Sequence, residues 1–284
     1  SQAAVVIGTS GTTGTPKEIF LSAHALVSSA RASNTFIGAK PGDTWSLLLP
    51  LTHVAAVNVF IRAFELGTIP ADLRNHDGEY PRVDFTAIVP TQLFRALNGD
   101  KHLLKHLQSA QKVLVGGAAL PQALQNQAAA AGINIVTTYG MSETSGGCVY
   151  NGEILNGVEV DVRGGSIFIR GNTLALNLDL QDGWFATNDL GEFVDDKLVV
   201  MGRSDDVIIT GGENLSLNNV ESTLIEHFPA LQVAAFSVED PQWGQTLHIA
   251  VVGEVDKSQL VSILESKIGS FAKPKGIHAV ESLP

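Results

Sequence analysis

Short β-rich runs alternate with helical patterns through the first half of the chain, and this alternation restricts the fold more than any other feature. Strand, helix, strand repetition predicts a mainly parallel sheet with helices on its faces, which is an α/β fold. Ligands of such sheets bind at the carboxyl ends of the strands. The predicted strands are residues 3–7, 45–49, 87–89, 112–115 and 133–137. The predicted helices run from a cap at Ser22 to about Ser33, from a cap at Thr91 to Leu97, and from Pro121 to Gly132.

The pattern changes twice in the second half of the chain. After Gly157 come short strands without helices, at residues 158–162, 167–169 and 198–201, which predict a small β-rich subdomain. Beyond Asp205, a helix capped by Ser216 is followed by two strands and a further helix, near residues 233–238, 247–252 and 258–268. We therefore expect a large domain over residues 1–204 and a small α+β lid over residues 205–284.

Composition excludes several classes of protein. The chain has 284 residues, enough for one large domain or two smaller ones, and no apolar run approaches the length of a membrane span. The formal net charge of −11 argues against a nucleic-acid surface, which needs clustered Lys and Arg. The single cysteine, Cys148, excludes an intrachain disulfide and fits a reducing compartment. With no basic and apolar leader visible, we expect a cytoplasmic location.

A glycine- and hydroxyl-rich loop follows the first predicted strand. It reads Thr9-Ser10-Gly11-Thr12-Thr13-Gly14-Thr15-Pro16-Lys17. Glycines let backbone N–H groups approach a polyphosphate, hydroxyls add donors, and Lys17 adds a positive charge. The spacing never gives the Gly-Lys-Ser/Thr of a Walker A loop, so the sequence does not indicate a P-loop NTPase. A flexible linker is the alternative, but an apolar strand before the loop and Pro-Lys after it are unusual for one.

This loop resembles the phosphate-binding signature of the acyl-adenylate-forming enzymes, which include acyl- and aryl-CoA synthetases, luciferases and nonribosomal adenylation domains. Three more segments match that family in the same order, and the resemblance extends over essentially the whole chain. It implies a large adenylate-forming domain followed by a small C-terminal lid. The three segments are Tyr139-Gly140-Met141-Ser142-Glu143-Thr144, Asp182-Gly183-Trp184-Phe185-Ala186-Thr187-Asn188-Asp189, and the run from Gly202 to Asn214 that begins Gly202-Arg203-Ser204-Asp205.

The resemblance implies an ATP site with Mg²⁺. Glu143 would bind Mg²⁺ through oxygen, Thr144 would contact the α-phosphate, and Tyr139 would stack on adenine beside Gly140 and Met141. Taken alone, Glu143 is better explained as a carboxylate favoured by a helix N-terminus, and the surrounding motif reverses that preference. The cradle for the leaving phosphates would be Thr9, Ser10, Gly11, Thr12, Thr13, Gly14 and Lys17.

Further nucleotide contacts are implied on other segments. Asp189 would accept hydrogen bonds from the ribose hydroxyls, and Arg203 would contact the nucleotide. Gly116 and Gly117 would line the adenine and acyl pockets. An exposed loop aspartate and an ordinary glycine turn are the alternatives for Asp189 and for Gly116-Gly117 respectively.

The lid carries two implied functional segments. Asp205 falls where the family has its hinge, about which the lid moves between an adenylate-forming and a thioester-forming arrangement. Gly211, Gly212, Glu213 and Asn214 would then approach the tunnel for the pantetheine arm of CoA. Two consecutive aspartates do not by themselves indicate a hinge.

Two features point to the acyl substrate. Pro50-Leu51-Thr52-His53 matches a family segment whose histidine lies beside the acyl pocket, and the resemblance implies that Ser142 would border the same pocket. Arg62 lies in an otherwise apolar helical stretch, where an arginine usually reaches to the surface or pairs with a buried carboxylate. In o-succinylbenzoate–CoA ligases, an arginine at this offset binds the second carboxylate of the substrate.

The run Thr144 to Gly152 also resembles the actinobacterial type of these ligases. The resemblance therefore implies 2-succinylbenzoate, ATP and CoA as substrates, an AMP-forming acid–thiol ligase, and menaquinone biosynthesis as the pathway. Homodimerisation stays open. Cys148 lies close to the motif, but no histidine motif accompanies it, so we interpret it as a buried thiol rather than a nucleophile.

The chain departs from the family pattern at both ends. It matches the stretch before the family's C-terminal Gly-Lys segment without reaching that lysine, and Lys273 and Lys275 belong to the preceding stretch. The portion that usually precedes the phosphate loop is also absent. We expect a trimmed sequence rather than a natural short form. The alternative functions are another aryl- or acyl-CoA synthetase and a non-catalytic adenylate-binding protein.

Overall fold

The computed structural model of the chain describes residues 2–9, 17–228 and 231–283. These residues form two compact units. The first comprises residues 1–187 and 191–200, and the second comprises residues 188–190 and 201–284.

The first unit is built on a seven-stranded sheet with the strand order β4-β3-β5-β6-β7-β8-β9. The strands from β4 to β7 pair in parallel, and β8 and β9 add to the edge in antiparallel pairing. The predicted mainly parallel sheet is therefore confirmed, except that the first predicted strand, residues 3–7, does not belong to it and lies instead in the separate antiparallel hairpin of β1 (Val5–Thr9). The strands are β3 (Trp45–Leu47), β4 (Ala71–Asp72), β5 (Phe85–Ile88), β6 (Lys112–Val115), β7 (Ile135–Met141), β8 (Gly146–Tyr150) and β9 (Glu153–Ile154).

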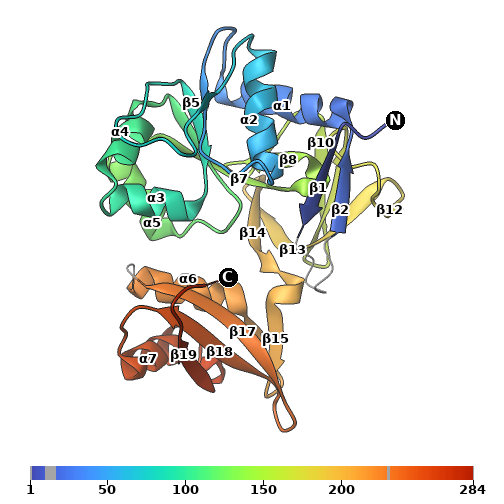
Figure 1. Cartoon of the computed structure of the whole chain (residues 1–284). Helices are drawn as coiled ribbons and strands as arrows, with labels where there is room; N and C mark the ends of the chain where they lie inside the picture. The colour runs from blue at the N-terminus through green and yellow to red at the C-terminus, as the bar shows by residue number, and fades with distance from the viewer. Residues whose placement is uncertain (1, 10–16, 229–230, 284) are drawn as a thin grey trace. The chain divides into compact units, whose positions relative to one another are not determined.

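Helices cover both faces of this sheet, as Figure 1 shows. On β6, Leu114 belongs to the buried cluster under α1 and α2, whereas Val113 and Val115 belong to the cluster under α3, α4 and α5. Successive side chains of a strand point to opposite faces, so a strand buried on both sides reads as a continuous apolar run. The helices are α1 (Ala23–Ile37), α2 (Val54–Glu65), α3 (Pro90–Leu97), α4 (Lys101–Ser109) and α5 (Gln122–Ala130).

The helix starts follow local capping chemistry. Ser22 caps α1 as predicted, because its Oγ accepts a 3.1 Å hydrogen bond from the Ala25 N–H. The predicted cap at Thr91 is wrong. α3 begins at Pro90, and the side chain of Gln92 accepts a 3.1 Å hydrogen bond from the Val89 N–H. Pro is favourable there because the first helical N–H has no partner within the helix.

Two β-rich parts complete the first unit and lead into the second. β1 (Val5–Thr9) and β2 (Lys17–Leu21) form an antiparallel hairpin. The β-rich region after Gly157 forms a sheet with the order β10-β11-β13-β12, in which β14 also pairs with β13. Its strands are β10 (Val158–Arg163), β11 (Ser166–Gly171), β12 (Leu180–Gln181), β13 (Trp184–Val194) and β14 (Lys197–Arg203).

The second unit is an α+β fold around its own core. Its sheet has the order β16-β15-β18-β17, with β19 parallel to β18. Ser216 caps α6, and Val220 and Leu224 of that helix are buried in the core, as the spacing predicts. The elements are β15 (Val207–Thr210), β16 (Glu213–Ser216), α6 (Leu217–His227), β17 (Gln232–Asp240), β18 (Gly244–Val252), α7 (Lys257–Lys267) and β19 (Gly276–Ala279).

None of the helices in the described parts of the chain combines the length and apolar character that a membrane crossing requires.

Candidate active site

The phosphate-binding loop connects the two strands of the first hairpin. Thr9 and Lys17 are register partners, and the Thr9 hydroxyl donates a 3.1 Å hydrogen bond to the Lys17 carbonyl. Ser10, Gly11, Thr12, Thr13 and Gly14 lie outside the described residues. The structure therefore describes the two ends of the loop, where Lys17 is exposed.

Glu143 lies on a short turn, η1 (Ser142–Thr144), that directly follows β7. Thr144 is buried and closes the turn: its Oγ1 accepts from the Met141 N–H at 3.0 Å and approaches the Gly146 carbonyl, to which it donates, at 2.7 Å. Ser145 then adopts a left-handed conformation, with φ of +54°. Within the described part of the chain, the Glu143 carboxylate has no hydrogen-bond or ion-pair partner. A half-buried carboxylate without a protein partner is a suitable oxygen ligand for Mg²⁺.

The stretch from Thr173 to Leu178 holds the hairpin beside this turn. The Ala175 N–H donates to the Glu143 carbonyl at 2.9 Å, and the Leu176 N–H donates to the Phe20 carbonyl at 2.8 Å. Asn177 adds a side-chain bond, since its Oδ1 accepts from the Phe20 N–H at 3.0 Å. β2, which follows the phosphate loop, and the Glu143 turn are therefore neighbours. Asn177 is not among the residues that the sequence analysis singles out.

The glycines predicted to line the pocket are positions of close backbone approach. A Cβ atom at Gly116 would lie 2.1 Å from Thr138 Oγ1, and one at Gly140 would lie 2.1 Å from the Gly146 carbonyl oxygen. Gly117 has a φ of +84°, which disfavours other residues. Gly116 and Gly117 follow β6, which pairs with β7, so these glycines and Gly140 come from neighbouring strands.

The Tyr139 side chain is half-buried and packs against the buried cluster that contains Cys148, Val149 and Ile167. Its stacking on adenine and the nucleotide contact of Met141 stay predictions. Cys148 is buried, which agrees with its interpretation as a buried thiol.

Arg62 is the most unusual charge of the first unit. It is only 4% exposed, and its guanidinium carbon lies 5.2 Å from the centre of the Trp45 ring. Nη2 donates a 3.0 Å hydrogen bond to Tyr150 Oη, whereas the buried Nε has no hydrogen-bond partner among the described residues. No carboxylate in the described residues forms an ion pair with Arg62, so neither usual explanation, exposure at the surface or a buried ion pair, applies. His53, at the start of the same helix, is exposed.

The second unit holds three of the predicted residues together. Arg203 donates to both carboxylate oxygens of Asp205, from Nε at 2.8 Å and from Nη2 at 2.6 Å. Its Nη1 lies 3.8 Å from Oδ1 of the buried Asp189. The Arg203 hydrogen bonds hold the pKa of Asp205 below its usual value, whereas burial, aided by the Asp205 charge, raises the pKa of Asp206. The Arg203 guanidinium therefore lies between the carboxylates of Asp189 and Asp205. Ribose binding by Asp189 and the hinge role of Asp205 stay predictions.

The predicted CoA segment forms a tight turn. Gly211 and Gly212 connect β15 to β16 with φ values of +59° and +88°. Two successive positive φ values are typical of a two-residue hairpin turn, which glycine adopts without strain. A Cβ atom at Gly211 would lie 2.9 Å from the Trp243 ring. Glu213 and Asn214 follow on β16, and both are exposed.

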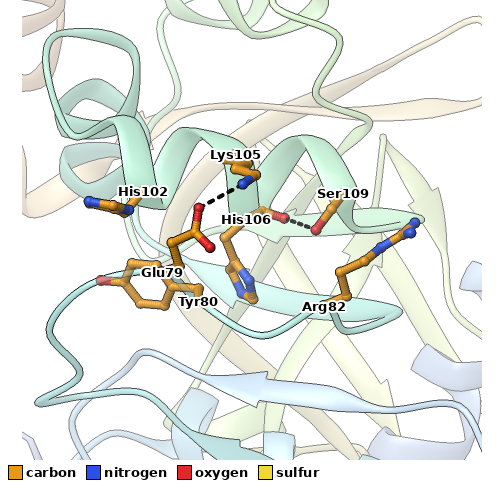
Figure 2. A pocket seen from close by; sticks show the side chains of 7 residues that line it. All are labelled: Glu79, Tyr80, Arg82, His102, Lys105, His106 and Ser109. Carbon is orange, nitrogen blue, oxygen red and sulfur yellow. Dashed lines mark hydrogen bonds and ion pairs between the residues drawn. The ribbon is translucent and has the colours of Figure 1, made fainter.

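A pocket of about 270 Å³ lies beside α4 of the first unit (Figure 2). Its cation Lys105 pairs with Glu79 at 2.8 Å, and His106 donates or accepts through both ring nitrogens, toward Ser46 and the Pro81 carbonyl. None of the predicted site residues lines it. The lining residues are Glu79, Tyr80, Arg82, His102, Lys105, His106 and Ser109.

Sequence comparison finds close relatives over the whole chain. It is 37% identical to the probable 2-succinylbenzoate–CoA ligase of Mycobacterium tuberculosis, over 99% of this chain and 80% of the relative. It is 29% identical to the 2-succinylbenzoate–CoA ligase of Bacillus licheniformis, over 99% of this chain and 67% of the relative.

Solved structures give the same picture. The o-succinylbenzoate CoA synthetase from Bacillus subtilis, in complex with the acyl-adenylate intermediate OSB-AMP, superposes with a TM-score of 0.84 at 25% identity. That match covers 99% of this chain and 66% of the solved one, so the chain spans about two thirds of its length. The same enzyme with ATP and magnesium ion gives a TM-score of 0.83 at 25% identity, covering 99% and 67%. The predicted adenylate-forming fold is confirmed.

Family models agree with the order of the motifs. The model described as AMP-binding enzyme matches residues 1–174, and the model described as AMP-binding enzyme C-terminal domain matches residues 219–284. The chain belongs to the AMP-binding enzyme family, and the curated relatives named above are 2-succinylbenzoate–CoA ligases.

Proposed function

We propose that this chain is an ATP-dependent 2-succinylbenzoate–CoA ligase that works through an acyl-adenylate in menaquinone biosynthesis, in the cytoplasm. The observation that carries this proposal is the buried guanidinium of Arg62, which pairs with no carboxylate of the described residues. The names of the relatives support the same reaction.

The reaction has two half-reactions. A substrate carboxylate oxygen attacks the α-phosphorus of ATP, and the bond to the bridging oxygen breaks as pyrophosphate leaves. The CoA sulfur then attacks the acyl carbon of the mixed anhydride, and AMP leaves. Little covalent chemistry is required of side chains, so positioning and charge neutralisation account for most of the rate enhancement.

The proposed roles follow the geometry of each unit. Lys17, at the end of the phosphate loop, neutralises the leaving phosphates. Glu143 would hold Mg²⁺, which supplies positive charge to the phosphates when it is bound. In the second unit, Asp189 binds the ribose, and the Arg203–Asp205 pair lies at the proposed hinge between a domain of residues 1–204 and a lid of residues 205–284.

Arg62 determines the acyl substrate in this proposal. A buried guanidinium with no counter-charge is unfavourable unless a ligand completes it, and a carboxylate matches its planar set of donors. A monocarboxylate uses its one carboxylate for adenylation and leaves Arg62 unpaired. A dicarboxylate such as 2-succinylbenzoate supplies a second carboxylate for Arg62.

The test is ATP-dependent pyrophosphate release with 2-succinylbenzoate, benzoate and a medium-chain fatty acid, with and without CoA. We expect release with 2-succinylbenzoate and its CoA thioester as product. Arg62→Ala should lose most of the activity with 2-succinylbenzoate, and Glu143→Ala should lose pyrophosphate release with every acid. Equal activity of wild type and Arg62→Ala with 2-succinylbenzoate would remove the proposed specificity. Nucleotide binding without any pyrophosphate release would instead indicate an adenylate-binding protein.

A further inference from the structure

Three elements of the first unit meet at the phenol of Tyr150. Tyr150 ends β8 and is fully buried. Its Oη lies 3.0 Å from Arg62 Nη2 of α2 and 2.9 Å from Ser33 Oγ of α1. A guanidinium has donors only, so the phenol oxygen accepts from Arg62. The Tyr150 and Ser33 hydroxyls share a second hydrogen bond, in which either can donate, so the bonds link Arg62 through Tyr150 to Ser33.

The Tyr150 ring is fixed by its neighbours. The Phe36 ring packs against it edge to face, with 5.4 Å between ring centres. A Cβ atom at position 147 would lie 2.5 Å from Tyr150 Cε1, so Gly147 leaves the room that the ring occupies. A ring packed this tightly is a rigid acceptor for its hydrogen-bond donor.

The remaining contacts of Arg62 leave most of its donors unused. The Trp45 ring lies against the guanidinium at 5.2 Å, and the Asn34 amide donates to the Arg62 carbonyl at 3.0 Å. The bond to Tyr150 uses one of the five N–H donors of a guanidinium. The buried Nε has no hydrogen-bond partner among the described residues, so the guanidinium keeps unused donors that a carboxylate could satisfy.

We propose that Tyr150, held by Ser33, is a positioning residue that orients Arg62 toward the second carboxylate of a dicarboxylic substrate. This inference rests on the proposed function, and it adds Tyr150 as the residue that orients the Arg62 guanidinium. Tyr150 itself does not contact the substrate. Its removal therefore affects recognition of the second carboxylate and leaves the chemistry at the reacting carboxylate intact.

The test compares Tyr150→Phe with wild type on 2-succinylbenzoate and on 4-oxo-4-phenylbutanoate, the analogue without the ring carboxylate. We expect the KM for 2-succinylbenzoate to rise about tenfold to a hundredfold, since a hydrogen bond to a charged group is lost. The kcat, the KM for ATP and the KM for the analogue should change less than about threefold. Ser33→Ala should give a smaller effect of the same kind.

Two controls separate positioning from general damage. Tyr80→Phe removes a phenol oxygen beside α4, outside the site, and should leave all constants unchanged. In the Arg62→Ala background, Tyr150→Phe should have no further effect on the selectivity for the dicarboxylate. Circular dichroism and denaturant unfolding check that each variant folds.

Equal effects of Tyr150→Phe on both acids, or effects that add to those of Arg62→Ala, would overturn the inference while the proposed function stands. If wild type releases no pyrophosphate with 2-succinylbenzoate, the proposed function fails, and calorimetric binding of 2-succinylbenzoate to the three proteins decides the inference. Binding that weakens in Tyr150→Phe as in Arg62→Ala supports it. Absent or unchanged binding contradicts it.

Discussion

The side chain of Asn58 donates a 2.7 Å hydrogen bond to the carbonyl oxygen of Ser145. Both residues are buried, and Ser145 directly follows the turn that carries Glu143. Asn58 lies four residues before Arg62 on α2, so the two side chains share a face of the helix. Helix α2 thus carries Arg62, which we propose binds the acyl substrate, and through Asn58 it also supports the Glu143 turn, which we propose binds Mg·ATP.

Asn58→Ala should therefore affect stability and nucleotide use together. The buried Ser145 carbonyl loses its donor, which we expect to lower the free energy of unfolding by about 1–3 kcal/mol and to raise the KM for ATP. Denaturant titration and pyrophosphate release measure the two effects. Asn134→Ala is the matched control, because its amide bonds the Gln111 carbonyl at 2.8 Å on the exposed surface. Equal losses in both variants would contradict the special role of Asn58.

Gly140→Ala should destabilise the first unit severely. Its Cβ would lie 2.1 Å from the Gly146 carbonyl oxygen and 2.6 Å from Gly147 Cα, and these are backbone atoms that cannot rotate away. Overpacking of this kind costs about 1–3 kcal/mol or more, which thermal or denaturant unfolding detects. Gly8→Ala, on β1, meets nothing within 4 Å and should be close to neutral. A neutral Gly140→Ala would show that β7 and β8 can separate without cost.

Stability should fall in mild acid because of His106. Burial lowers the pKa of His106, whose ring is hydrogen-bonded to Ser46 and to the Pro81 carbonyl. The unfolded chain takes up this proton near pH 6.5 and the folded chain only at lower pH. The stabilising contribution is complete above about pH 6.5 and is lost as the pH falls toward the folded pKa.

Denaturant midpoints between pH 5 and pH 7.5 measure this dependence. His106→Gln, which cannot titrate, should show a shallower decline than wild type. Identical slopes in the two proteins would assign the acid sensitivity to other groups, such as His248, whose pKa is also lowered by burial.

Trp184→Leu should lower the stability of the first unit by about 1–2 kcal/mol, since two cations lie over its ring. The guanidinium carbons of Arg163 and Arg170 are 5.0 Å and 4.6 Å from its centre. Trp243→Leu is the comparison, because a single ammonium, that of Lys275, lies 5.4 Å from that ring. Unfolding of both variants in parallel should show the larger loss at Trp184. The opposite order would show that these contacts contribute little beyond apolar burial.

The fold could be predicted from the sequence where a helix or strand is determined by its own residues rather than by a distant partner. The strand at residues 112–115 has the predicted bounds because both of its faces are buried. β7 extends past its predicted end to Met141, because the antiparallel partner β8 continues the pairing. α4 was not predicted, although Asp100 caps it and Leu103 and Leu107 are buried at helical spacing. The sequence of β7 alone does not show that β8 will pair with it and extend it. The capping residue and the leucine spacing of α4, in contrast, are visible in the sequence.

The site was predictable only as a set of motifs. Their order indicated the family, but Asn58 and Asn177 bind backbone groups 87 and 157 residues away, so neither forms a pattern along the sequence. For Arg62, the sequence alone left surface exposure and a buried ion pair as structural alternatives. Only three-dimensional packing places its charge next to Tyr150 and Trp45, with no carboxylate of the described residues paired to it.

Besides the side chain of Asn177, two main-chain hydrogen bonds, from the N–H groups of Ala175 and Leu176, hold the first hairpin beside the Glu143 turn. Neither bond depends on which side chain occupies those positions. Homologues can therefore diverge in sequence here while they keep the same junction, and an alignment would score the stretch as variable. A saturation scan should tolerate most replacements at the exposed Leu176 and only small residues at the buried Ala175. At both positions it should reject proline, which has no N–H, and single-residue deletions, which shift the register. The structural role of these positions would therefore be visible in the absence of proline and of deletions among homologues, and not in a conserved residue type.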